Sequence, residues 1–245
     1  MTPHRASLML TTRQPPYRQR SYCMDLTDAI RQRKSIRSFR PDTVARQIVE
    51  EMLDIARRAT SRENSQPWEV AVVTGDVLDR IRRENVEALV SGTMPNPDVL
   101  MSHLQGIYRQ RQIEVAVQIF QLMGIAREDK QKRAEWMQRG YRYFDAPVAM
   151  ILYGDRSLDD VHTQFDISGF AQTICLAALH FGLGTCVEIQ GVSYPQVLRK
   201  HLGIPESKRI TISIALGYPD WEFPANRLES KREPVESFTT WHGFA

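Results

Sequence analysis

The sequence predicts one domain of the α+β class, either a general α+β fold or a three-layer αβα arrangement in which helices enclose a small sheet. Three observations predict this class. Apolar residues recur at helical spacing over most of the chain, few segments have the apolar or β-branched character of strands, and no period of 20–50 residues repeats. The 245 residues are 42% hydrophobic and 25% charged, which is ordinary globular composition.

The first third of the chain is predicted to contain two helices and a strand. Thr27 is expected to cap a short helix that ends near Arg33. Thr43 is expected to cap a second helix, because apolar residues from 44 to 59 form one stripe at helical spacing. Residues 70–74 are predicted to form a buried strand that ends at a glycine.

The remaining elements follow the same logic. Asp76 is expected to cap a helix that extends to residue 90, and a polar loop follows. Residues 108–142 have a helical but strongly charged pattern, so we expect them to lie over a pocket or a partner subunit. Strands are predicted at residues 147–153, 185–189 and 210–216, and helices at residues 165–181 and, capped by Ser193, up to 202.

Charge and composition argue against nucleic acid and membranes as partners. The net charge is +3, and the four arginines of residues 1–23, which contain no acid, leave the remainder at 3 − 4 = −1. No apolar run approaches the ~20 residues that a membrane-spanning helix needs. Cys23, Cys175 and Cys186 have no metal-ligand or C-x-x-C spacing, so we expect reduced thiols, no metal site and a cytoplasmic location.

Residues 1–23 are predicted to be a disordered extension, and the domain is predicted to span residues 24–245. The arginine-rich, acid-free composition of the extension is also that of an organellar transit peptide. Pro15 and Pro16 interrupt it, however, and it shows no amphipathic period. Met24 directly precedes the first predicted helix and is the alternative start of the protein.

Two polar clusters suit a ligand that combines a phosphate with a heterocyclic ring. The first consists of Arg33, Lys34, Ser35 and Arg37. Guanidinium groups chelate two phosphate oxygens at once, and a serine hydroxyl adds a short hydrogen bond. The second, residues 60–68, contains Asn and Gln side chains that are both donors and acceptors, as the edge of a uracil-like ring requires. A solvated helix end and an ordinary turn before a core tryptophan are the structural alternatives.

Two further segments lie in the second half of the chain. Residues 182–191, with the sequence GLGTCVEIQG, follow a predicted helix and open a strand, which is the reverse of the dinucleotide-binding fingerprint and excludes a Rossmann site. A strand that ends in glycine can still offer backbone N–H groups to a ligand. The other segment is G-Y-P followed by S-K-R-E-P, which brings a second cationic group able to reach the same phosphate.

In this order and spacing, the four segments resemble the FMN-dependent nitroreductase family. The family pattern R-x-S-x-R matches residues 33–37, N-x-Q-P-W matches residues 64–68, and the two later segments match as well. The resemblance extends from Met24 to Trp241. It implies a three-layer αβα fold with a central, mostly antiparallel sheet enclosed by helices, and a homodimer whose C-terminal extension lies over the partner.

The resemblance implies a set of FMN-binding residues: Arg33, Lys34, Ser35, Arg37, Ser61, Asn64, Gln66, Gln190, Gly191, Ser230 and Arg232. Arg33, Ser35 and Arg232 would hold the phosphate, and Lys34 would add backbone contacts. Some family members have Lys where Ser230 stands, which leaves Arg232 and the first cluster as the main phosphate ligands.

The rest of this set would hold the isoalloxazine ring. Arg37 would lie beside the pyrimidine ring, and Gly191 or the adjacent Gln190 would offer a backbone N–H to flavin N5. The loop of residues 61–66 would complete the contacts, in part from the other subunit. Many members have Glu at the position of Gln190, so the charge beside N5 is expected to be missing here.

The implied activity is reduction of nitroaromatic compounds by a ping-pong mechanism, in which NAD(P)H gives hydride to flavin N5 before the acceptor takes its place. No catalytic residue is assigned, because the flavin carries the chemistry. A quinone or free-flavin reductase is the alternative within this class, and reductive dehalogenation is a more distant variant. A flavin-binding protein without turnover is the alternative from another class.

The charged segment of residues 108–142 is expected to roof the acceptor pocket. The candidates for stacking on a planar aromatic acceptor are Tyr108, Trp136, Tyr141, Tyr143 and Phe144, and Arg109, Arg111 or Arg142 would meet a substrate carboxylate. Core packing or a place in the dimer interface explains each of them equally well. The tail carries Trp221, Phe223, Phe238, Trp241 and Phe244, which would form an exposed patch unless a partner subunit covers it.

Overall fold

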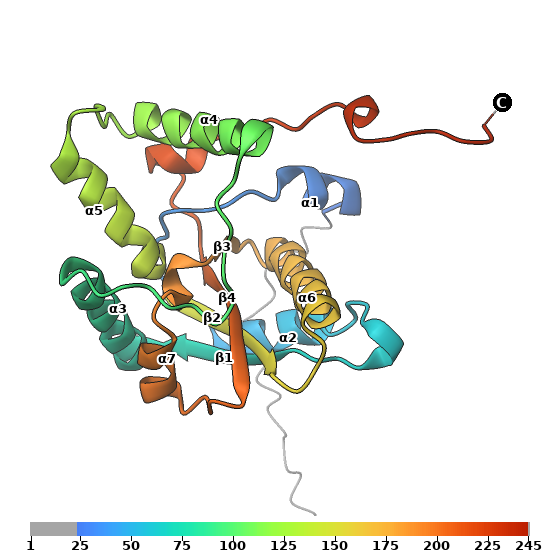
Figure 1. The fold of residues 1–245 in the computed structure, drawn as a ribbon, viewed down its shortest axis with the longest axis horizontal. Coiled ribbons are helices and arrows are strands. Elements are labelled where there is room, and N and C mark those ends of the chain that lie inside the picture. Colours follow the sequence, from blue (N-terminus) through green and yellow to red (C-terminus); the bar gives the residue numbers. More distant parts are fainter. Residues whose placement is uncertain (1–23, 245) are drawn as a thin grey trace, which may run out of the picture.

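A computed structural model describes residues 24–244, in which a four-stranded sheet lies between two layers of helices (Figure 1). The strand order is β1-β2-β4-β3, and the strands are β1 Glu69–Thr74, β2 Val148–Asp155, β4 Lys208–Gly217 and β3 Gly184–Glu188. All three strand pairings are antiparallel. The predicted fold class, a three-layer αβα arrangement around an antiparallel sheet, is confirmed. The predicted extension of residues 1–23 lies outside the described residues.

The helices of the described residues are α1 Leu26–Gln32, α2 Arg46–Ala56, α3 Gly75–Val90, α4 Gly106–Leu122, α5 Lys130–Tyr141, α6 Asp160–His180 and α7 Pro195–Leu202. All the predicted helices are present, and the charged segment of residues 108–142 is divided between α4 and α5. Within the described residues, no helix is long and apolar enough to cross a membrane.

The predicted caps were wrong in several places. Asp25, not Thr27, caps α1, because its Oδ1 accepts the Thr27 N–H at 2.8 Å. α2 starts after Ala45, two residues beyond Thr43, without a side-chain cap. α3 follows Thr74, so that Asp76 lies in its first turn.

The predicted cap of the last helix was wrong as well. α7 follows Tyr194 rather than Ser193, because Pro195 at its first position fixes the backbone angle that starts the helix.

Side chains alternate across the sheet and feed two separate cores. On β2, Val148, Met150 and Leu152 face the core shared with α2 and α6. Ala149 and Ile151 face the opposite core, which is shared with α3 and α7. Because successive residues of a strand point to opposite faces, both faces must be apolar, and the near-continuous apolar run of β2 satisfies both layers.

α4 and the C-terminal tail lie at the edge of this body (Figure 1). The one buried residue of α4 is Ile119, whereas Ile113 and Val117, on the face predicted to be apolar, are each 46% exposed. The tail has two short 3-10 turns, Pro224–Arg227 and Val235–Ser237, and otherwise no regular structure. Its last part extends away from the body, which leaves the aromatic rings near its end uncovered by this chain.

Candidate functional site

The Arg33–Arg37 segment lies directly beside β3. Ser35 forms a parallel bridge with Thr185, and the Ile36 N–H donates to the Thr185 carbonyl at 2.9 Å. The approach is close enough that a Cβ at Gly184 would come within 2.5 Å of the Ile36 side chain. Glycine is therefore required at position 184, where it lets the cationic segment dock on the strand.

A cavity of about 940 Å³ opens at the start of this segment. Its lining combines Arg33 and Lys34 with Ser230 and Arg232 from the tail. Two segments almost 200 residues apart in sequence are thus brought to one hollow, as the predicted phosphate site requires. The Arg232 side chain folds back on its own segment, where Nη1 donates to Ser230 Oγ at 2.7 Å.

Asn226 connects the tail to the cationic segment, and sequence reasoning missed it. Its side chain is almost completely buried, and its Oδ1 accepts the Arg37 N–H at 2.6 Å. Its Nδ2 donates to the carbonyls of Ser38 at 2.8 Å and Asp220 at 2.7 Å. A single asparagine between alanine and arginine carries no sequence signal for a contact 189 positions away.

The predicted ring end of the site lies beyond the end of β3, in the 3-10 turn Gln190–Val192. Because the Ser35–Thr185 bridge is parallel, Arg37 lies toward this end. Arg139 of α5 donates to the Arg37 carbonyl at 3.0 Å. The Gln190 side chain packs against the same helix, with Nε2 3.1 Å from Met137 Sδ. The structure therefore brings Arg33, Lys34, Ser35, Arg37, Gln190, Gly191, Ser230 and Arg232 to one continuous strip beside β3.

Buried polar groups pack against Gly191 and hold it in place. Tyr143, itself fully buried, donates its hydroxyl to the Gly191 carbonyl at 2.7 Å. Tyr143, Phe144 and Asp145 all have positive φ, so that their side chains are presented by a left-handed turn. The buried carboxyl group of Glu188 completes the support, and burial raises its pKa well above the usual range. An acid at an inward-facing position of a strand is the sequence signal that could have identified Glu188.

Charges near the ring end are positive. The Arg139 guanidinium lies 4.7 Å from the centroid of the Phe223 ring. Burial lowers the pKa of Arg139, and the carboxylate of Asp145, at 3.5 Å, opposes this shift. Burial also raises the pKa of the Cys186 thiol to about 12, so this cysteine is an inert core group. Phe223, which we predicted to need a partner as cover, is thus covered in part by its own chain.

The 61–66 loop lies apart from this strip. Asn64 and Gln66 are exposed, both have positive φ, and Gln66 Nε2 donates to the Asn64 carbonyl at 3.1 Å. The loop is anchored to α6 by the Arg62 N–H, which donates to Asp166 Oδ2 at 3.0 Å. The cavity beside β3 touches Leu179, near the other end of α6. At about 1.5 Å per residue of helix, the loop's anchor at Asp166 and this cavity lie roughly 20 Å apart.

The tryptophan of the same motif has a structural role. Trp68 stacks on Phe170 of α6 with ring centroids 4.6 Å apart and planes inclined by 5°. It packs against the core that contains α2 and α6. Trp68 is therefore a core tryptophan that follows a turn, which was the alternative to a ligand-binding role for this residue.

The aromatic candidates for substrate contact fall into two groups. Tyr141 and Phe144 are buried in the core on the α3 side of the sheet, where packing accounts for them. Tyr108 is exposed on α4, and the Arg111 guanidinium lies 5.8 Å from its ring centroid. Trp136 is half-buried on α5, 6.4 Å from Phe144. Tyr143, the fifth candidate, is fully buried in the same core, so Tyr108 and Trp136 are the two that remain open to a ligand.

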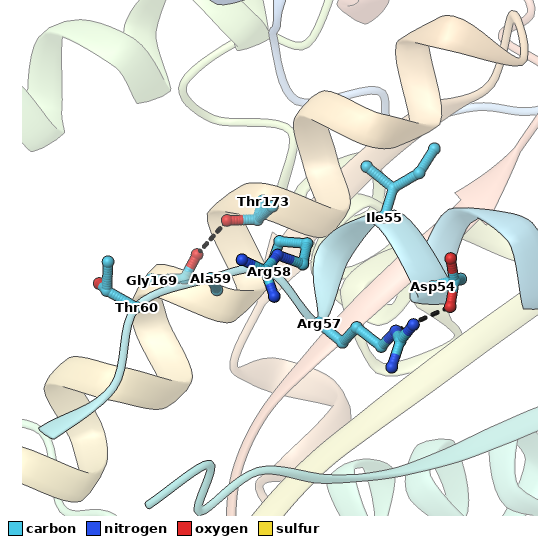
Figure 2. Close-up of a pocket in the computed structure, with 8 residues that line it drawn as sticks. All are labelled: Asp54, Ile55, Arg57, Arg58, Ala59, Thr60, Gly169 and Thr173. Atoms are coloured by element: carbon cyan, nitrogen blue, oxygen red, sulfur yellow. Dashed lines mark hydrogen bonds and ion pairs between the residues drawn. The ribbon is translucent and has the colours of Figure 1, made fainter. Parts of the chain in front are cut away.

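A second hollow lies between the end of α2 and α6 (Figure 2). Several of its polar groups pair within the lining: Arg57 pairs with Asp54 at 2.7 Å, and Thr173 Oγ1 donates to the Gly169 carbonyl at 2.8 Å. None of the predicted site residues lines it. The cavity beside β3 is therefore the candidate functional site.

Comparison with known proteins agrees with this geometry. The sequence profile of the Nitroreductase family matches residues 30–218, more than three quarters of the chain. The chain belongs to the nitroreductase family. The match includes the cationic segment and the Gln190–Gly191 turn, and ends just before the tail segment that supplies Ser230 and Arg232.

Individual relatives of this nitroreductase-family chain are similar over almost their whole length. A nitrobenzene nitroreductase of Ectopseudomonas oleovorans is 33% identical over 220 residues, covering 88% of this chain and 96% of the relative. A 4-nitrobenzoate reductase of Pseudomonas putida is 29% identical over 225 residues, covering 90% and 96%. The crystal structure of the FMN and NADPH-dependent nitroreductase NfnB of Sphigopyxis sp. strain HMH matches with a TM-score of 0.86 at 28% identity, covering 90% of this chain and all of that one.

Proposed function

We propose that this chain is an FMN-dependent oxidoreductase that uses NAD(P)H to reduce nitroaromatic compounds. The observation that carries the proposal is the cationic cavity, in which Arg33 and Lys34 meet Ser230 and Arg232. The similar proteins support it, since they include a nitrobenzene nitroreductase, a 4-nitrobenzoate reductase and an FMN and NADPH-dependent nitroreductase.

The residues of the cavity fit the phosphate of FMN. Arg33 and Arg232 offer guanidinium groups, which suit bidentate contacts with phosphate oxygens, and Ser230 offers a hydroxyl. Gly184, also in the lining, keeps this wall free of a side chain. Arg232 would exchange its contact with Ser230 Oγ for the phosphate, so that a hydrogen bond to an uncharged hydroxyl gives way to a stronger ion pair.

Bound FMN supplies hydride acceptance and donation at N5, and the protein supplies binding and electrostatics. Gly191 would present its backbone to the ring, held in place by the Tyr143 hydroxyl. Arg37 and Arg139 place positive charge at the same end, which favours a ring that carries negative charge after reduction. Turnover would be of the ping-pong type, with NAD(P)H and the acceptor using one place in succession.

A homodimer would complete the flavin site. The 61–66 loop lies roughly 20 Å from the phosphate cavity along α6, too far to close over the same end of a ligand in its own chain. The exposed Asn64 and Gln66 of the partner's loop would instead face the strip, with the tail as a second link between the subunits. This division supports an interface site.

The test is a substrate panel on the purified protein. We expect a yellow protein whose flavin absorbance is bleached by NADH or NADPH and restored by nitrobenzene or 4-nitrobenzoate. Faster recovery with quinones or free flavins than with any nitroaromatic compound would favour the alternative reductases. A coloured protein that neither nicotinamide bleaches would favour a binding protein without turnover.

A further inference from the structure

A carboxyl group is buried directly below the predicted N5 contact. Glu188, the last residue of β3, is only 7% exposed. Its Oε1 reaches Ser213 Oγ of β4 at 3.4 Å, and its Oε2 is buried without any hydrogen-bond partner among residues 24–244. A buried polar atom without a partner is costly, so its retention needs a reason beyond packing.

The position of this group relative to Gly191 is closely defined. A Cβ at Gly191 would lie 2.8 Å from Glu188 Oε1 and 2.2 Å from Tyr143 Cε1. The carboxyl group and the phenol ring therefore pack directly on the Cα of Gly191. Together with the Tyr143 hydroxyl bond to the Gly191 carbonyl, they fix the turn that the flavin ring would contact.

The groups around Glu188 come from several elements. A charge on Glu188 would raise the pKa of two titratable neighbours, Tyr143 and Cys186. The Ser213 hydroxyl faces Glu188 from β4. The positive charge of Arg82, on α3, acts to lower the pKa of Tyr143, and that of Arg37 acts to lower the pKa of Cys186.

Within the described part of the chain, however, no cation offsets the burial of Glu188, and burial holds its pKa well above the usual range. Burial therefore favours the uncharged form of this carboxyl group.

From this arrangement we infer that Glu188 is a positioning residue that acts on the flavin through Gly191. Its carboxyl group supports the Gly191 turn, and its ionisation as the pH rises would make the bound flavin harder to reduce. The inference rests on the proposed FMN site. Reduction adds negative charge to the ring, and a second negative charge a few ångströms away in a medium of low dielectric opposes it. Conversely, reduction of the flavin must raise the pKa of Glu188 further, because the two are linked.

The first experiment measures the midpoint potential of the FMN-loaded, full-length protein across a range of pH. Glu188→Gln has the same shape but cannot ionise, and Glu87→Gln, on the exposed face of α3, is the matched control. We expect the three proteins to coincide at acidic and neutral pH. Above the pKa of Glu188, the potentials of the wild type and of Glu87→Gln should fall more steeply than that of Glu188→Gln. Parallel curves over the whole range would overturn the inference.

A second measurement needs no variant and covers the case in which Glu188→Gln does not fold. The infrared difference between reduced and oxidised wild-type protein should show a protonated carboxylic acid band that shifts on reduction. No such band would contradict an uncharged Glu188 coupled to the flavin. Flavin content separates this failure from that of the proposed function: a protein that does not retain FMN refutes the site itself, whereas FMN-loaded protein with parallel potentials refutes only the role of Glu188.

Discussion

The strip beside β3 and the 61–66 loop both carry motifs of the same family, yet the chain holds them in opposite ways. The strip is fixed by internal contacts: Ile36 bonds to β3, Asn226 holds Arg37, and Tyr143 supports Gly191. The loop is anchored at its base, but its Asn64 and Gln66 side chains are exposed. Contacts within one chain fix the strip, whereas the loop leaves the Asn64 and Gln66 side chains exposed and bonds Gln66 Nε2 to the Asn64 carbonyl.

Backbone conformation sharpens this difference. The 61–66 loop and the turn that supports the strip at Gly191 both contain consecutive non-glycine residues with positive φ, a conformation that costs on the order of 1–3 kcal/mol each for most residues. At Tyr143–Asp145 the cost is offset by buried packing, since Tyr143 and Phe144 are core residues. At Glu63 and Asn64 the side chains are exposed and no such packing is present in the chain. This difference supports the proposal that a partner subunit provides the surface against which the loop packs.

The largest expected effect is that of removing residues 234–245. Phe238, Trp241 and Phe244 are all more than 60% exposed in the single chain, and a partner is the surface that would cover them. Obligate interfaces commonly bury ~2,000 Å² or more, so losing this segment should weaken the dimer strongly. Because the proposed flavin site draws residues from both chains, FMN content should fall with it. Sedimentation and flavin absorbance of the truncated protein measure both, and a monomer that retains stoichiometric FMN and turns over would falsify the arrangement.

Asn226→Ala tests how far the strip depends on its internal contacts. The substitution removes three hydrogen bonds and leaves the buried Arg37 N–H without a partner, so we expect a loss of roughly 2–4 kcal/mol in the free energy of unfolding. Denaturant unfolding of the FMN-free protein measures it. Asn64→Gly, in the exposed loop, is the control, because glycine accepts the positive φ of this position, and it should cost less than ~0.5 kcal/mol. Equal losses in the two variants would remove the distinction between the two regions.

Arg232→Ala tests the phosphate anchor at a smaller scale. The fold should be unaffected, because Arg232 is exposed and bonds only within its own segment. Affinity for FMN should fall by roughly 1.5–3 kcal/mol, the contribution of a charged hydrogen bond. The flavin-to-protein absorbance ratio after dilution reports this loss, with Arg227→Ala as the control outside the cavity lining. Full occupancy in dilute Arg232→Ala protein would count against the assignment.

The outcome of sequence reasoning follows the same division. Contacts encoded by local pattern were predictable: the strands, the helices and the cationic segment that precedes Ser35. Caps failed where several candidates competed within a few residues, as with Asp25 and Thr27. Asn226 was assigned no role, and Tyr143 was assigned to the substrate rather than to the support of Gly191. Their partners, Arg37 and Gly191, lie 189 and 48 positions away. The sequence predicted that Gln190 leaves the place beside N5 without a charge. It did not predict that Glu188, two positions earlier, is buried, because that burial depends on packing from the other elements of the fold.

The smallest expected effect is that of starting the chain at Met24. If residues 1–23 are a disordered extension, their removal should leave melting temperature, FMN content and turnover unchanged within error. Differential scanning fluorimetry and the flavin absorbance ratio of the two proteins provide the comparison. A lower melting temperature or a loss of FMN on truncation would mean that the extension packs on the domain.

Intersubunit complementation tests most directly whether the two regions serve one flavin from two chains. One variant would lack the anchor, Arg33→Ala with Arg232→Ala, and the other the loop side chains, Asn64→Ala with Gln66→Ala. Each should bind FMN poorly as a homodimer. In a heterodimer isolated through two different affinity tags, one site receives both defects and the other receives none, so roughly one FMN should bind per dimer. Heterodimers as empty as the two homodimers would show that each site is built from a single chain, which would contradict the two-chain site.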